Sequence, residues 1–370
     1  MSVPERDMKP AVGVPGQPAF GVKSGEKVGL HIGEWRDGRW SYLYDKGRSG
    51  YRGGADGNGG VAEAARRQRV GELDEAAVVQ GPVIKPPVWT WEVPLYFWFG
   101  GIAAGSSFVA LACDLAGDER SARTARAIAL GALAPSPPLL IMDLGRPERF
   151  YKMLRIFKPR SPMSMGVWAL TAFGGLAATG VGADLLGRRK TAKALGGVNA
   201  VVGGYLGSYT GVLLASTAVP VWSRSRLFLG PIFVSTAAAT GAAACRLVLV
   251  AQGLPEGHPT RKALGRVESV AMATELALST INERRLGPLG DSLETGRPGT
   301  LFKAAKWSVR AGLACRLGRE RGGSWTHHLA SVLYLAGGLL FRYAWVGSGP
   351  VSASDDRQVA ATARSRRHGS

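Results

Sequence analysis

Cysteine and histidine are scarce in this sequence, which limits the redox chemistry that the chain can carry by itself. Three cysteines and five histidines occur among 370 residues. Cys113, Cys245 and Cys315 form no C-x-x-C pair and lie in or beside apolar stretches, so we expect small buried side chains. A four-cysteine iron–sulfur cluster would therefore belong to a partner. His327 and His328 lack a histidine on another apolar stretch to share a haem, so no haem is expected.

Charged residues are also few, at 20% of the chain, and they avoid the long stretches of alanine, glycine and leucine. Residues 1–85 hold 13 of the 46 basic and 11 of the 27 acidic residues, which leaves 33 basic and 16 acidic residues for 86–370. The positive excess thus lies in connections between apolar segments, a pattern typical of membrane proteins. The pI of about 10.3 is then weak evidence for nucleic-acid binding, and we expect no nucleic-acid partner.

The first 85 residues contain no apolar run long enough to cross a bilayer. They are rich in Gly, Pro, Arg and Asp, and they begin without the pattern of a cleaved secretory signal. Five aromatic residues stand among charges from Trp35 to Tyr51, which predicts a segment that orders against a partner subunit. We divide the chain into a soluble, partly ordered extension over 1–85, a membrane domain over 86–350 and a polar basic tail over 351–370.

From Trp91 onward, apolar stretches of membrane-crossing length follow one another. A hydrocarbon core of about 30 Å needs roughly 20 apolar residues per helix. The sequence predicts an all-α integral membrane protein, a bundle of about eight transmembrane helices, with six or seven as the alternative. The expected spans are 92–114, 124–144, 164–186, 195–220, 226–251, 264–283, 300–317 and 326–346. Charges in the sixth and seventh suit a polar interior, and the seventh also suits an interfacial helix. Prolines within Ala134–Pro138 predict a break in the second.

Three groups of segments carry specific patterns: WTWEVPLYFWFGGIAAGS at Trp89–Ser106; DLGRPERFY at Asp143–Tyr151 with SPMSMGVW at Ser161–Trp168; and SYTGVLL at Ser208–Leu214 with PVW at Pro220–Trp222. Together they resemble the NrfD/polysulfide-reductase membrane subunit family. The resemblance implies a multi-helix anchor of the cell membrane that binds quinone, either menaquinone or ubiquinone. It also implies an iron–sulfur subunit that exchanges electrons with this chain and a molybdopterin catalytic subunit.

Tyr209 stands inside an apolar, glycine-bearing stretch, where its phenol needs a hydrogen-bond partner. The residues alone leave a backbone carbonyl, Thr210 or a quinone carbonyl open. The resemblance implies that Tyr209 donates to the quinone. Trp91 and Glu92 at the mouth of the first span fit either an interfacial aromatic belt with its carboxylate or further polar contacts of the quinone pocket.

Asp143 closes the second span, and Arg146 follows three residues later. A carboxylate near a helix C-terminus is unfavourable against the helix dipole unless a cation compensates it. The pair either pins the loop to the bundle or also serves the site, with Arg146 in the quinone pocket and Asp143 in a proton route.

Glu268 and Glu275 are seven residues apart and so share one helical face. With Thr274 and Ser279 they predict a polar seam through the sixth span. The two carboxylates either belong to a proton route or are neutralised by ion pairs, for which Arg246 and Lys306 are the expected cations.

We therefore expect the membrane subunit of a respiratory oxidoreductase complex, with proton movement left open. A secondary transporter and a purely structural anchor are the alternatives. Transporters of that class contain internal repeats, and the first and last four spans show no convincing self-similarity.

If Asp143 and Arg146 form a pair, Arg146→Ala should reduce the amount of assembled complex, because it leaves a carboxylate partly desolvated and unpaired. Asp143→Asn in the same chain should partly restore that amount. A double variant that assembles without quinone activity would indicate a chemical role. The measurement is complex yield and quinone turnover in both single variants and the double variant, and additive losses would contradict coupling.

Overall fold

The computed structural model describes residue 84, residues 86–144, 147–318 and 325–355, and the single residues 359 and 362. Trp35–Tyr51 and Arg146 lie outside the described residues. Within the described ranges every regular element is helical, which confirms the all-α class. By its contacts the chain splits into two units, Met1–Val88 and Trp89–Ser370, and the second unit is described below.

The second unit consists of long helices connected by short ones. Their bounds are α3 (Glu92–Leu115), α4 (Glu119–Leu133), α5 (Ser136–Asp143), η2 (Pro147–Arg149), α6 (Tyr151–Arg155), α7 (Pro162–Leu185), α8 (Arg189–Ala215), α9 (Pro220–Arg224), α10 (Arg226–Ala251), α11 (Pro259–Leu286), η3 (Gly287–Gly290), α12 (Asp291–Glu294), α13 (Gly296–Leu317) and α15 (Trp325–Ala353).

Six helical segments among the described residues are long and apolar enough to cross a membrane. They are α3, α4 continued by α5, α7, α8, α10 and α15. This composition supports a multi-pass membrane protein. The remaining two expected spans form helices of sufficient length, 28 residues in α11 and 22 in α13, but their charges keep them out of the apolar set. The count of about eight spans therefore stays a prediction.

The predicted break in the second span is confirmed. Helix α4 ends at Leu133 and α5 begins at Ser136, with a turn between them. Pro135, Pro137 and Pro138 have no N–H to donate to the preceding turn, so a continuous ladder of hydrogen bonds cannot form there.

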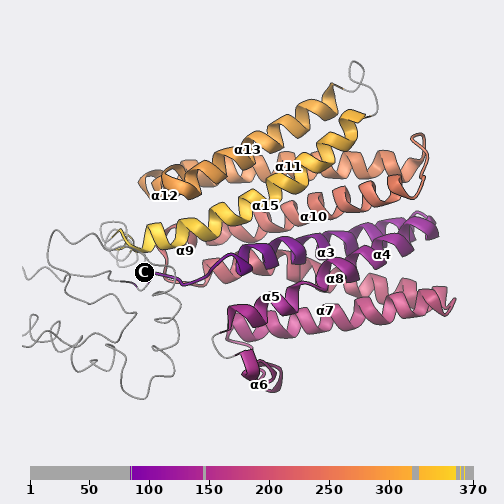
Figure 1. Ribbon diagram of the computed structural model, residues 1–370, viewed down its shortest axis with the longest axis horizontal. Helices are drawn as coiled ribbons and strands as arrows, with labels where there is room; N and C mark the ends of the chain where they lie inside the picture. Colours follow the sequence, from indigo (N-terminus) through magenta and orange to yellow (C-terminus); the bar gives the residue numbers. More distant parts are fainter. Residues whose placement is uncertain are drawn as a thin grey trace, which may run out of the picture. The chain divides into compact units, whose positions relative to one another are not determined.

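The long helices form two groups, which lie beside each other in Figure 1. In the first bundle α3 packs on α4 and α8, and α7 packs on the same two helices. In the second bundle α10 packs on α11 and α15, and α13 packs on α15 and α11. Helix α10 also packs on α3 and α8 and so joins the two bundles.

Successive long helices run in opposite directions, which gives the structure two ends. At one end α3, α7 and α10 each finish at a glycine with positive φ: Gly117 at 77°, Gly187 at 70° and Gly253 at 82°. Glycine reaches this conformation without the steric cost that a Cβ brings, so the chain can reverse within a few residues. We call this the glycine-turn end. The opposite end, where α3, α7 and α10 begin, is called the motif end.

Asp118 fixes the glycine-turn end by linking both bundles. It caps α4 by accepting a hydrogen bond from the Ser121 N–H at 3.1 Å, and it accepts another from the Thr260 hydroxyl of α11 at 2.5 Å. Partial burial opposes ionisation of Asp118, but these hydrogen bonds outweigh it and lower the pKa of its carboxyl below the ordinary value.

The junction of α3 and α10 is a contact between backbones. A Cβ on Gly105 would overlap the carbonyl of Ala237 and stand 3.0 Å from the Gly241 Cα. A Cβ on Gly241 would in turn overlap the backbone of Gly105 and Ser106. Only glycine at these two positions lets the helices approach so closely, as small residues do at helix contacts in membranes.

Gly241→Ala should therefore push α3 and α10 apart and destabilise the protein by about 1–3 kcal/mol, the usual cost of overpacking. Gly131→Ala on α4 is the matched control, because nothing lies within 4 Å of the added Cβ. Thermal unfolding of the two purified variants checks this. Equal melting temperatures for both would contradict a backbone contact at Gly241.

Candidate functional site

Tyr209 connects α8 to the start of α7 at the motif end. Its side chain is 3% exposed, and its hydroxyl donates to the Pro162 carbonyl at 2.5 Å. Its ring lies against Gly166, where an added Cβ would overlap the phenol. Of the partners open from the sequence, the structure has a backbone carbonyl, and the carbonyl belongs to the SPMSMGVW segment.

Two further tyrosines surround Tyr209. Tyr96 of α3 is buried and lies close enough to interact electrostatically with Tyr209. Tyr205, one helical turn before Tyr209, stacks on its ring with centroids 5.8 Å apart and keeps 42% of its surface exposed. Segments from all three groups of sequence patterns therefore meet around the Tyr209 phenol. The stacked Tyr205 ring extends from this phenol to the outer surface.

Trp91 and Glu92 stand at the start of α3. The Trp91 side chain is 48% exposed, and its carbonyl accepts a hydrogen bond from the Tyr343 hydroxyl of α15 at 3.0 Å. Glu92 is buried and accepts a hydrogen bond from the Thr90 hydroxyl. The hydrogen bond of Trp91 is made with α15, whereas that of Tyr209 is made with the start of α7, so these two residues are held by different helices.

The PVW segment closes the motif end on the α15 side. Trp222 is fully buried, stacks on Trp89 with centroids 5.2 Å apart, and donates its indole N–H to the Trp345 carbonyl at 2.8 Å. Its ring fills the space beside Gly349, where an added Cβ would overlap it. The chain before α3 is thereby held against α9 and α15.

Asp143 is the last residue of α5 and is partly exposed. Arg146 lies outside the described residues, so the expected pair between them stays a prediction.

A buried ion cluster occupies the glycine-turn end of the first bundle. Arg126 of α4 donates to both oxygens of Asp184 at 2.6 and 3.0 Å and to Asp114 at 2.5 Å. The three side chains are 7%, 10% and 5% exposed. The cluster joins α3, α4 and α7, so Asp114 is more than the simple boundary residue that its position at the end of the first span suggests.

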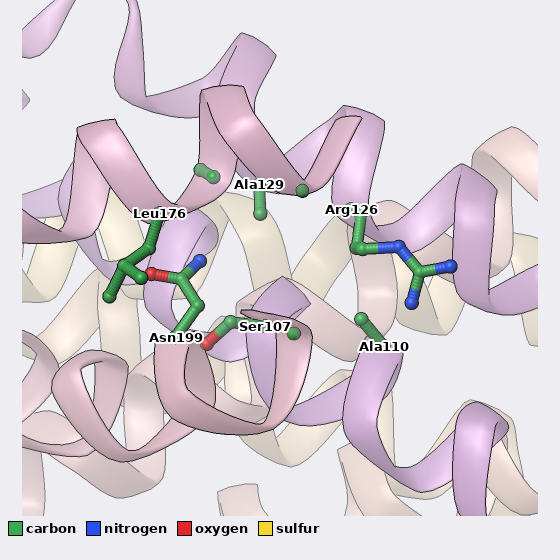
Figure 2. A pocket seen from close by; sticks show the side chains of 9 residues that line it. Ser107, Ala110, Arg126, Ala129, Leu176 and Asn199 are labelled. Carbon is green, nitrogen blue, oxygen red and sulfur yellow. The ribbon is translucent and has the colours of Figure 1, made fainter. Parts of the chain in front are cut away.

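A cavity of about 10 Å³ adjoins this cluster, lined among others by Arg126, Ser107 and Asn199 (Figure 2). This is about the volume that one water molecule needs. The Asn199 Oδ1 atom is buried and has no hydrogen-bond partner among the described residues. A small cavity therefore lies inside the first bundle, with mostly apolar walls and three polar residues among those that line it.

In the second bundle, Glu268 is fully buried and forms an ion pair with Arg316 of α13. It also accepts a hydrogen bond from the Ser331 hydroxyl at 2.8 Å, and Arg246 donates to the same hydroxyl oxygen at 3.1 Å. The expected cation was Arg246 or Lys306. The structure corrects this, because Arg316 is the direct partner and Arg246 lies one hydrogen bond away.

The polar seam on α11 is present with one change. Glu268, Glu275 and Ser279 are buried on one face. Thr274 is exposed and donates to the Val270 carbonyl of its own helix, so it does not belong to the seam. Asn282 continues the seam, and its amide donates to the Ser225 hydroxyl at 3.0 Å.

Comparison with known proteins agrees with this arrangement. Residues 82–281, more than half of the chain, match the family described as "Polysulphide reductase, NrfD". The chain belongs to this family. A stretch of 92 residues is 35% identical to the C subunit of the polysulfide reductase of Wolinella succinogenes, covering 23% of this chain and 29% of that relative. The chain thus matches less than a third of the length of this relative.

Sequence reasoning missed two buried arginines. Arg126 and Arg342 are 7% and 1% exposed, although both lie in segments that are apolar enough to cross a membrane. The signal in the sequence was a cation inside an apolar span, which needs a partner in the bundle interior. Identifying that partner required the packing, because Asp184 is 58 residues away from Arg126.

Arg126→Met should lower the yield and thermal stability of the protein strongly, by about 3–5 kcal/mol, because it removes the buried cation that the two carboxylates share. Arg189→Met is the matched control. Its pair with Glu119 is 63% and 53% exposed and should contribute at most about 1 kcal/mol. Similar unfolding temperatures for both variants would show that the buried cluster does not hold the first bundle together.

Proposed function

We propose that this chain is the quinone-reactive membrane subunit of a respiratory oxidoreductase in the cell membrane. In this proposal it binds quinone or quinol and exchanges electrons with an iron–sulfur subunit, and a molybdopterin subunit performs the catalysis. Family membership supports the role of membrane subunit in a reductase complex. The quinone, the two partners and the location are our extension of that role.

The observation that carries the proposal is the convergence at Tyr209. The phenol is buried between α7 and α8, and it donates to a carbonyl at the first turn of α7. A quinone carbonyl that took the place of the Pro162 oxygen would receive the same hydrogen bond. The Tyr205 ring, stacked on Tyr209 and partly exposed, gives an apolar ligand a path from the lipid to this position.

The surface beside this site suits the approach of a soluble subunit. Between α5 and α7 the chain exposes Phe150, Tyr151, Leu154, Ile156 and Phe157. Basic residues alternate with them, namely Arg149, Lys152, Arg155, Lys158 and Arg160. The Ile156 carbonyl accepts hydrogen bonds from the Ser164 hydroxyl and the Trp168 indole, which fixes this segment to the start of α7. We assign this surface to the iron–sulfur partner.

Each quinone reduced takes up two electrons and two protons. In the proposal the partner supplies the electrons, while the residues of this chain orient the quinone and exclude water from it. Trp91, Glu92 and Arg146 stay proposed as further contacts of the quinone, and Asp143 as a group that passes protons at the same end.

Tyr209→Phe tests the site directly, because it removes one hydroxyl and keeps the shape of the ring. Losing one hydrogen bond to a neutral carbonyl should weaken quinone binding by about 1 kcal/mol, roughly fivefold, and lower quinone turnover of the assembled complex. Tyr205→Phe is the matched control and should leave turnover near the original rate. Unchanged turnover in a correctly assembled Tyr209→Phe complex would remove Tyr209 from the site.

A further inference from the structure

Glu275 differs from every other buried carboxylate described above in having no direct partner. It lies near the middle of α11 and is 4% exposed. Among the described residues it accepts no hydrogen bond and forms no ion pair, whereas Glu268, two turns earlier, has both. An unpaired charge at this depth is costly, so the state of this carboxyl group must depend on what surrounds it.

A cavity of about 10 Å³ lies next to Glu275, between α10, α11, α13 and α15. Its walls include Glu275, Lys306, Thr236 and Met272. The volume suits one water molecule, and three of the residues that line the cavity, Glu275, Lys306 and Thr236, carry polar groups. Glu275 and Lys306 therefore face the same water-sized space.

Lys306 leads from this cavity toward the motif end. Its ammonium group lies 2.5 Å from the Glu283 carboxylate, and the two side chains are 18% and 19% exposed. Glu283 stands four residues after Ser279, whose hydroxyl donates to it at 3.3 Å. A chain of ionisable groups thus runs from the partly exposed Glu283 to the buried Glu275.

Arg342 of α15 is the other charge near Glu275. It is 1% exposed, donates to the Phe233 carbonyl at 3.1 Å, and lies 3.8 Å above the Phe233 ring. It interacts electrostatically with Glu275 without a direct ion pair. Helix α10 contributes only the uncharged Thr236 to the cavity wall. The carboxylate form of Glu275 therefore has a cation nearby, and the neutral acid avoids the cost of burial, so both forms are accessible.

We propose that Glu275 is a proton-binding site of the second bundle, loaded from the motif end through Glu283, Lys306 and one cavity water. The cavity water gives a proton to the Glu275 carboxylate, which becomes a neutral carboxylic acid. The Lys306 ammonium returns a proton to that water and is itself reprotonated from the aqueous phase through Glu283. One proton moves inward, and no electron is transferred.

This site goes beyond the proposed quinone chemistry. Helices α13 and α15, which supply Lys306 and Arg342, follow the residues 82–281 that match the family. Proton binding at Glu275 needs neither quinone nor a partner subunit. It can therefore be tested separately from the role of Tyr209.

The experiment is infrared difference spectroscopy of the full chain in lipid vesicles, comparing acidic with alkaline buffer. We expect a protonated-carboxyl band that Glu275→Gln abolishes and Glu275→Asp retains at a shifted position. Glu268→Gln is the matched control. It should keep the Glu275 band, because Glu268 is the carboxylate of an ion pair with Arg316 and is not the group that takes up the proton. An unchanged carboxyl spectrum in folded Glu275→Gln, or a band lost in Glu268→Gln alone, would overturn the proposal.

The route is tested by following the same band after a rapid change of pH. Lys306→Met should slow its appearance by roughly a hundredfold, the lower end of what a positioned proton-transfer group contributes. Lys303→Met on the exposed face of α13 should leave the rate unchanged. Equal rates in both variants would exclude Lys306 from the path.

Discussion

The close approach of α3 and α10 is the constraint on which the remaining structure depends. Gly105 and Gly241 place the two helix backbones against each other, and no side chain separates the bundles at that point. Helices in a membrane are not driven together by the hydrophobic effect, because lipid is as apolar as their own side chains. Close backbone contact supplies the dispersion energy instead. It also fixes the position of α3, which carries Tyr96 and Glu92, relative to the second bundle.

Buried ionic groups then determine which helices pair within each bundle. The Arg126 cluster links α3, α4 and α7, and the Glu268–Arg316 pair links α11 to α13. Such pairs are costly to desolvate, so they specify which helices must meet more than they add stability. Glu275 is the exception, since it lies beside a water-sized space and is separated from its nearest cations. Glu268 and Glu275 share one helix face but differ in their surroundings. We therefore propose different roles for them, a structural ion pair for Glu268 and proton binding for Glu275.

The two ends of the structure differ for reasons that lie in the chain itself. Glycines with positive φ make three of the connections at the glycine-turn end short and tight. The motif end has the longer connections and includes α6, α9 and α12. Loops on a rigid helical scaffold are where binding residues commonly lie. The convergence of the family segments at the motif end follows this rule.

The sequence by itself determined the class of the protein, the approximate helix bounds and the break before Ser136. It could do so because hydrophobic length and proline act locally along the chain. It also placed Glu268 and Glu275 on one face, since helical periodicity is a local property. Only the tertiary structure decided which cation neutralises Glu268, that Tyr209 donates to Pro162, and that Arg126 joins Asp114 to Asp184. Those pairings connect residues up to 58 positions apart. They depend on which helices pack together, and hydropathy along the chain carries no information about that.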